Sequence, residues 1–106
     1  MNLANLQIEG LLMAIASINH VLVRRGLLSA EDIEIALRKA EAIQTGSGAW
    51  EGLSPVHRSA ISFPILLLQL ANRCQPEADL PCFSELAGMV GRMKAPGEDQ
   101  DRTFSK

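Results

Sequence analysis

The sequence predicts an all-α fold, a bundle of four helices in an orthogonal or up-and-down arrangement that begins with a helical hairpin. Apolar residues make up 47% of the 106-residue chain, and many recur at three- and four-residue steps, the spacing of one helix face. Aromatic residues amount to 4%, which depletes the types that favour strands. The chain is too short for two hydrophobic cores, so we expect one domain over residues 1–94.

The first predicted helix runs from about Leu3 to Arg25. Arginines in its last turn oppose the negative end of the helix dipole, and Gly26 follows at the position that commonly adopts a left-handed conformation. Helical spacing places eight large aliphatic residues along one broad face. These residues are Leu3, Leu6, Ile8, Leu11, Leu12, Ile15, Ile18 and Leu22. Met13, Val21 and Val23 widen this apolar surface beyond what one small bundle covers, which indicates self-association.

A second helix is predicted to start at Ala30 and to end near Gln44. Ser29 precedes Asp32 by three residues, and Leu28 and Ile33 occupy the positions of a hydrophobic staple. Its predicted buried stripe consists of Ile33, Leu37, Ala40 and Ile43. Because four residues separate the first two helices, we expect a hairpin in which they pack side by side.

The glycine-rich stretch over residues 45–53 lacks apolar periodicity and is predicted to be the longest internal loop. Ser54 and Pro55 then read as the cap and first residue of a third helix that ends near Arg73. Pro64 falls inside it, so we expect a kink, or a break that would make five helices in all. Residues 61–70 are apolar nearly all round, which predicts a central position in the bundle.

A fourth helix is predicted to start near Pro81. Its apolar side consists of Cys82, Phe83, Leu86, Met89, Val90 and Met93. From residue 95 to 106 the chain has proline, glycine and charge with little to bury, which predicts a disordered tail.

Composition also bounds the function. The formal net charge of −2 gives no general attraction to nucleic acid or anionic lipid. Two cysteines are too few for a disulfide scaffold. No Lys or Arg precedes Arg24, Glu9 interrupts the first apolar stretch, and the nearly uncharged run over residues 59–72 is shorter than a membrane span. We therefore expect a soluble cytoplasmic protein.

Our leading functional hypothesis is a non-enzymatic interaction or regulatory module that forms a homodimer or binds another protein. The apolar excess of the first helix supports it, as does Trp50, a large indole between glycines in the predicted loop. The predicted contact residues are Leu3, Leu6, Met13, Val21 and Trp50.

Two alternatives remain open from the sequence. A helical nucleic-acid-binding regulator would use the basic pairs Arg24–Arg25 and Arg38–Lys39, although we expect these to lie at opposite ends of the hairpin. A small ligand- or metal-binding protein would use a polar site with His20, His57 and Cys82. No spacing matches a known cysteine metal motif, so we assign no catalytic residue, metal or cofactor.

The run VLVRRGLLSAEDIEIALRKAE, residues 21–41, resembles the short helical hairpin found in nitrile hydratase subunits and their accessory proteins. The cysteine-rich metal motif of the catalytic subunit of that family is absent. The resemblance therefore implies a hairpin and carries over no active-site residue.

Overall fold

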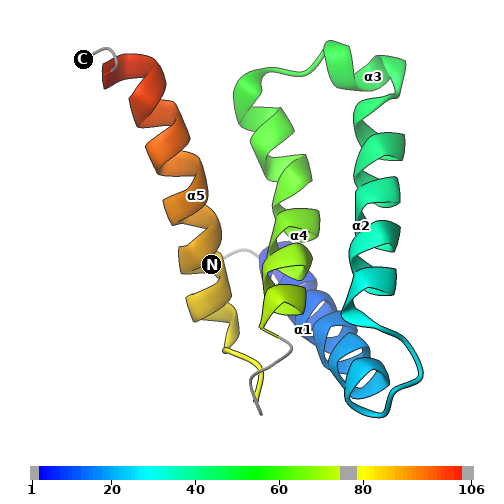
Figure 1. Cartoon of the computed structure of the whole chain (residues 1–106). Coiled ribbons are helices and arrows are strands. Elements are labelled where there is room, and N and C mark those ends of the chain that lie inside the picture. The colour runs from blue at the N-terminus through cyan, green and yellow to red at the C-terminus, as the bar shows by residue number, and fades with distance from the viewer. Residues whose placement is uncertain (1–2, 75–78, 104–106) are drawn as a thin grey trace.

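The computed structural model describes residues 3–74 and 79–103, and the side chains of this part as far as Met93. Its elements are helices: α1 (Leu3–Arg24), α2 (Ala30–Thr45), α3 (Gly48–Glu51), α4 (Pro55–Arg73) and α5 (Phe83–Thr103) (Figure 1). The described part contains no strand, so the predicted all-α class is confirmed.

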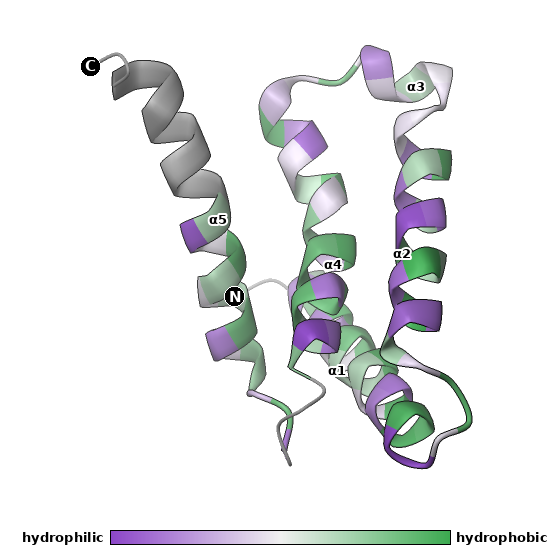
Figure 2. Ribbon diagram, viewed as in Figure 1, coloured by the Kyte–Doolittle hydropathy of each residue, from purple (hydrophilic) through white to green (hydrophobic). Residues whose placement is uncertain are grey.

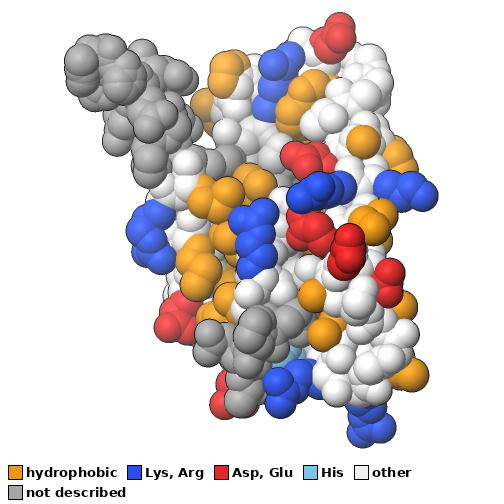
Figure 3. Space-filling model, in the orientation of Figure 1, with side chains coloured by type: hydrophobic (Ala, Val, Ile, Leu, Met, Phe, Trp, Pro, Cys, Tyr) orange, Lys and Arg blue, Asp and Glu red, His pale blue; other side chains and the backbone are white. Residues whose placement is uncertain are grey.

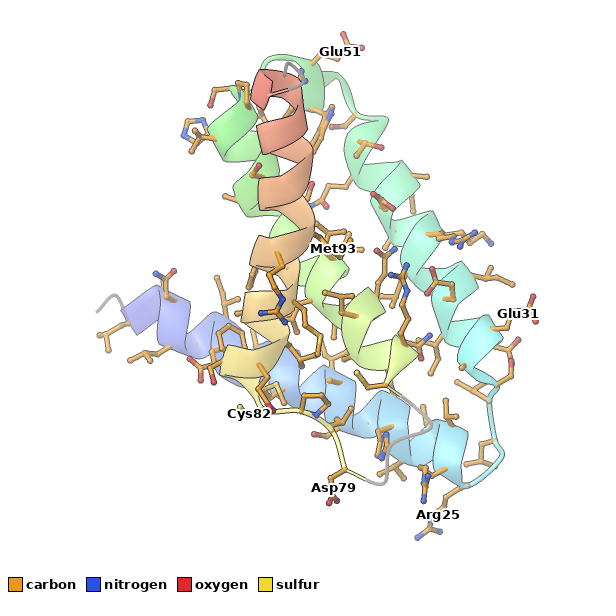
Figure 4. All side chains as sticks on the ribbon, turned by 60° about the vertical axis from the view of Figure 1, so that its left-hand side comes forward. Arg25, Glu31, Glu51, Asp79, Cys82 and Met93 are labelled. Carbon is orange, nitrogen blue, oxygen red and sulfur yellow. The ribbon has the colours of Figure 1, made fainter. Side chains whose placement is uncertain are left out.

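Helix α4 lies at the centre of the bundle. Figure 1 shows α2, α4 and α5 in a row in which neighbours run in opposite directions, and Figure 4 shows α1 crossing this row. Each of α1, α2 and α5 packs against α4. The fold thus combines an up-and-down row with one crossing helix, and the predicted central position of residues 61–70 is confirmed.

The predicted side-by-side packing of the first two helices is wrong. Gly26 has a φ of 74° and ends α1 as expected, and residues 25–29 form the short connection to α2. Within the described residues, however, both helices make their main contacts with α4 and not with each other. The apolar segment of α4 over residues 61–70 gives each of them a surface on which to bury side chains.

The start of α2 follows the sequence prediction closely. The Ser29 hydroxyl accepts a hydrogen bond from the backbone N–H of Asp32 at 2.9 Å, and the Asp32 carboxylate accepts one from the backbone N–H of Ser29 at 3.0 Å. This capping box satisfies two helix-end donors. The hydrogen bond from the Ser29 backbone, and then that from its side chain, lowers the pKa of Asp32 below its ordinary value.

The stretch predicted as a loop contains a short helix. Helix α3 is capped by the Ser47 hydroxyl, which accepts from the backbone N–H of Trp50 at 3.3 Å, and Gly52 ends it. This helix, and not a break at Pro64, brings the number of described helices to five, because α4 runs through Pro64 without interruption. The packing of α4 against three neighbours outweighs the backbone hydrogen bond that Pro64 removes.

The core joins α4 to α1 and α5. Its buried residues are Leu12, Ala16, Leu67, Leu68, Ala71, Leu86 and Val90. The predicted stripe of α2 is buried only in its first half, since Ile33 is buried but Ile43 is 76% exposed. On α5, Leu86 and Val90 are buried as predicted, whereas Cys82, just before the helix, and Met93 are exposed.

Helix α5 begins at Phe83, two residues after the predicted start. The backbone N–H of Cys82 donates to the Glu85 carboxylate at 3.1 Å, which caps the helix. The side chains of the predicted tail, residues 95–106, lie outside the described part of the structure. Its backbone belongs to α5 as far as Thr103, and the prediction of disorder stays a prediction.

One buried polar residue links the end of α4 to the start of α2. The Asn72 side-chain amide donates to the backbone carbonyl of Ala30 at 2.9 Å, and Asn72 is buried. Replacing Asn72 with alanine leaves this carbonyl without that donor, so we expect the free energy of unfolding to fall by about 2 kcal/mol. Urea denaturation measures this change. Arg73→Ala, at an exposed neighbour, is the control and should change stability by less than about 0.5 kcal/mol.

Candidate interaction surface

Helix α1 has two apolar sides, and the core covers one of them. Leu12 and Ala16 face the core and are 4% and 2% exposed. Of the eight aliphatic residues that the sequence placed on one broad face, only Leu12 is buried. Leu3, Leu6, Ile8, Leu11, Ile15 and Ile18 are exposed, and Leu22 is half-buried. The predicted face therefore exists, but it points mainly to solvent.

The exposed side of α1 follows the spacing of a coiled coil. Six aliphatic residues occur at alternating four- and three-residue steps, and we call this set the α1 seam. Its members are Ala4, Ile8, Leu11, Ile15, Ile18 and Leu22. A mean step of 3.5 residues keeps an apolar stripe facing a partner helix over its whole length. Figure 2 shows that α1 is mostly hydrophobic along its length.

The α1 seam carries no charge. The charged residues of α1 are Glu9, half-buried on another side of the helix, and Arg24 at its end. Leu3 and Val21, predicted contact residues, flank the seam and are exposed, as is Leu6. Met13, also a predicted contact residue, instead packs against the core, because it lies on the side of α1 that faces α4.

A cavity of about 620 Å³ lies next to the N-terminal half of the seam, where α1, α4 and the start of α5 meet. Leu6 and Ile8 of α1 line it, together with Phe63 of α4 and Phe83 of α5. The two phenyl rings pack edge to face with their centroids 6.2 Å apart. The cavity is therefore largely apolar and continuous with the exposed side of α1.

Trp50 lies away from this surface. It is half-buried on α3, which lies between the end of α2 and the start of α4, whereas α1 lies near the start of α2 and the end of α4 (Figures 1 and 4). The Arg58 guanidinium stands 5.5 Å from the Trp50 ring, and its Nε donates to the Trp50 carbonyl at 3.1 Å. The indole thus takes part in a local contact between α3 and α4, and the structure does not bring it together with the predicted contact residues of α1.

The basic residues of the nucleic-acid alternative do not form one continuous positively charged surface. Arg25 lies at the end of α1 (Figure 4), while Arg38 and Lys39 lie in the second half of α2. The Arg38 Nε pairs with the Glu34 carboxylate at 3.0 Å. Figure 3 shows acidic and basic side chains intermixed on the visible face of α2. Nucleic-acid binding stays a prediction without a structural observation in its favour.

The residues of the alternative polar site come from separate places. His20 is half-buried on α1, His57 is exposed in the first turn of α4, and Cys82 is exposed just before α5. Among the described residues, no group of three or more His, Cys, Asp or Glu side chains has an arrangement that could hold a metal ion. The structure therefore gives no geometry for this site.

Sequence reasoning missed the cavity and the regular spacing of the α1 seam. The alternating step was present in the sequence and could have been read as a coiled-coil seam distinct from the core side. The cavity had no such signal, because its walls come from three segments that are distant in the sequence, residues 5–9, residues 59–64 and Phe83. No family model, characterised protein or solved structure matches the chain, so the resemblance of residues 21–41 to the nitrile hydratase hairpin gains no support.

Proposed function

We propose that the protein is a non-enzymatic, self-associating helical module that forms a homodimer through the α1 seam. The single observation that carries this proposal is the uncharged, exposed stripe of aliphatic side chains with coiled-coil spacing on α1. Leu11 and Ile18 in this stripe are 63% and 60% exposed in the monomer. Large contiguous apolar surfaces on soluble proteins are typically interaction sites.

A second copy of the chain fits this surface best. An aliphatic stripe without charge is complementary to itself, and a two-fold axis places the same stripe of each copy in contact. The 22 residues of α1 span about 33 Å, long enough for three heptads of interhelical packing. Pairing two seams removes apolar side chains of both copies from water, which supplies the driving force.

A helix partner explains α1 better than a lipid bilayer does. By length and composition α1 is able to cross a membrane, and it is the one helix among the described residues that meets this test. Crossing would, however, separate Leu12 and Ala16 from the core and place the Glu9 carboxylate in the hydrocarbon region, which is costly. Pairing through the seam leaves these residues where they are.

The proposal places the protein in the cytoplasm. Cys82 is an exposed free thiol. An exposed free thiol is typical of a reducing compartment.

Sedimentation velocity over a protein concentration range of roughly 1 to 300 µM tests the proposal, because dimer formation must follow mass action. We expect the sedimentation coefficient to rise from a monomer to a dimer value. A monomer at every concentration would contradict the proposal. Dominant partitioning of the protein onto neutral phosphatidylcholine vesicles would also contradict it, in favour of a membrane role.

A further inference from the structure

The cavity beside the seam has the size and lining of a small-molecule site. Its volume of about 620 Å³ lies within the usual range for ligand pockets. Most of its wall is apolar, with Phe63, Pro64 and Phe83 on the α4 and α5 sides. Asn5, Glu9 and Ser59 add polar groups to the lining, so the cavity has an apolar wall and a polar edge.

Glu9 gives the cavity a negative charge. Its side chain lines the cavity and is half-buried, and it forms no ion pair within the described part of the chain. Among the side chains that the structure describes, no Lys, Arg or His lines the cavity. A partly desolvated carboxylate attracts a cation more strongly than one in bulk water and repels an anion. The faces of phenyl rings also attract cations.

We propose that this cavity binds a small organic cation with an apolar tail, of the alkylammonium class. The ammonium group pairs with the Glu9 carboxylate at the polar edge, and the tail lies against Phe63 and Phe83. This inference is independent of the proposed dimer. The two sites adjoin, because Ile8 belongs to the seam and also lines the cavity.

Titration of ¹⁵N-labelled protein with three probes that each contain an eight-carbon chain tests the proposal: octyltrimethylammonium, octanol and octanoate. Each titration is repeated in Ile15→Glu, which removes the seam contact at a residue outside the cavity. We expect saturable amide shifts near Glu9, Phe63 and Phe83 with the ammonium probe in both proteins. Octanoate binding as tightly as the ammonium probe, or no saturable shift with that probe, would overturn the proposal.

Two variants assign the binding to its residues. Glu9→Gln should raise the dissociation constant of the ammonium probe about tenfold and leave that of octanol within about twofold, because only the charge is removed. Glu31→Gln, at an exposed acid of α2, is the matched control and should change neither constant (Figure 4). Ala60→Trp places an indole on the cavity wall and should abolish the shifts with all probes. Unchanged ammonium binding in a folded Ala60→Trp protein would refute the location.

Discussion

Replacing Ile15 with glutamate is expected to convert the proposed dimer into a monomer and to raise its dissociation constant at least about a hundredfold. Ile15 lies near the middle of α1 and of the seam and is 42% exposed in the monomer. A two-fold axis brings the two copies of this position close together. The variant would therefore bury two unpaired carboxylates in an apolar contact, a large desolvation cost with like-charge repulsion added.

Sedimentation velocity of the variant and of the wild type at equal concentrations measures the change. Ile43→Glu is the matched control, because it makes the same substitution on α2 at a side chain that is 76% exposed and outside the seam. This control should dimerise like the wild type. A dimer that survives Ile15→Glu would show that another surface holds the copies together.

Leu67→Ala is expected to lower the free energy of unfolding by about 3 kcal/mol, which is a large part of the stability of a domain of this size. Leu67 is 0% exposed and belongs to the core cluster in which α4 meets α1 and α5. Truncation removes buried methyl groups and leaves a cavity that three helices cannot close without losing other contacts.

Urea denaturation followed by circular dichroism measures this loss at one fixed protein concentration, since self-association would otherwise contribute to the apparent stability. Val56→Ala is the control, because Val56 is 75% exposed and its truncation should cost less than about 0.5 kcal/mol. A loss below about 1 kcal/mol at Leu67 would mean that the core is not organised around this residue.

Local signals in the sequence were sufficient to predict where α2 begins and that α4 is central. The capping box at Ser29 depends on residues three apart, so no distant contact is needed to form it. Likewise, a segment that is apolar on all sides has to be surrounded, whatever surrounds it. Both features follow from chemistry contained within one segment.

The errors concern how the segments meet. Periodicity showed that α1 is apolar over a wide arc, but it did not show whether the part with Leu12 or the part with Ile15 faces the core. The choice depends on α4, whose shape is not encoded in α1. The same reason explains why the predicted packing of α1 against α2 was wrong. The short connection at residues 25–29 constrains where α2 begins but not which helix it packs on.

The exposure of apolar residues on α1 was predictable, but none of the predicted contact residues belongs to the α1 seam. Leu3, Leu6 and Val21 were chosen because they exceed what one core can cover, and all three are exposed. Met13 was chosen for the same reason but packs against the core, since side-chain spacing alone does not distinguish the two sides of a widely apolar helix. The cavity was beyond sequence reasoning, because it forms only where α1, α4 and α5 come together.

The central position of α4 has a consequence for synthesis. Translation proceeds from the N-terminus, so α1 and α2 leave the ribosome before the helix on which both pack has been made. Until about residue 73 emerges, both sides of α1 are open to water and to any other nascent chain nearby. The order of the helices therefore leaves the aliphatic side chains of α1 uncovered until the last residues of α4 have been made.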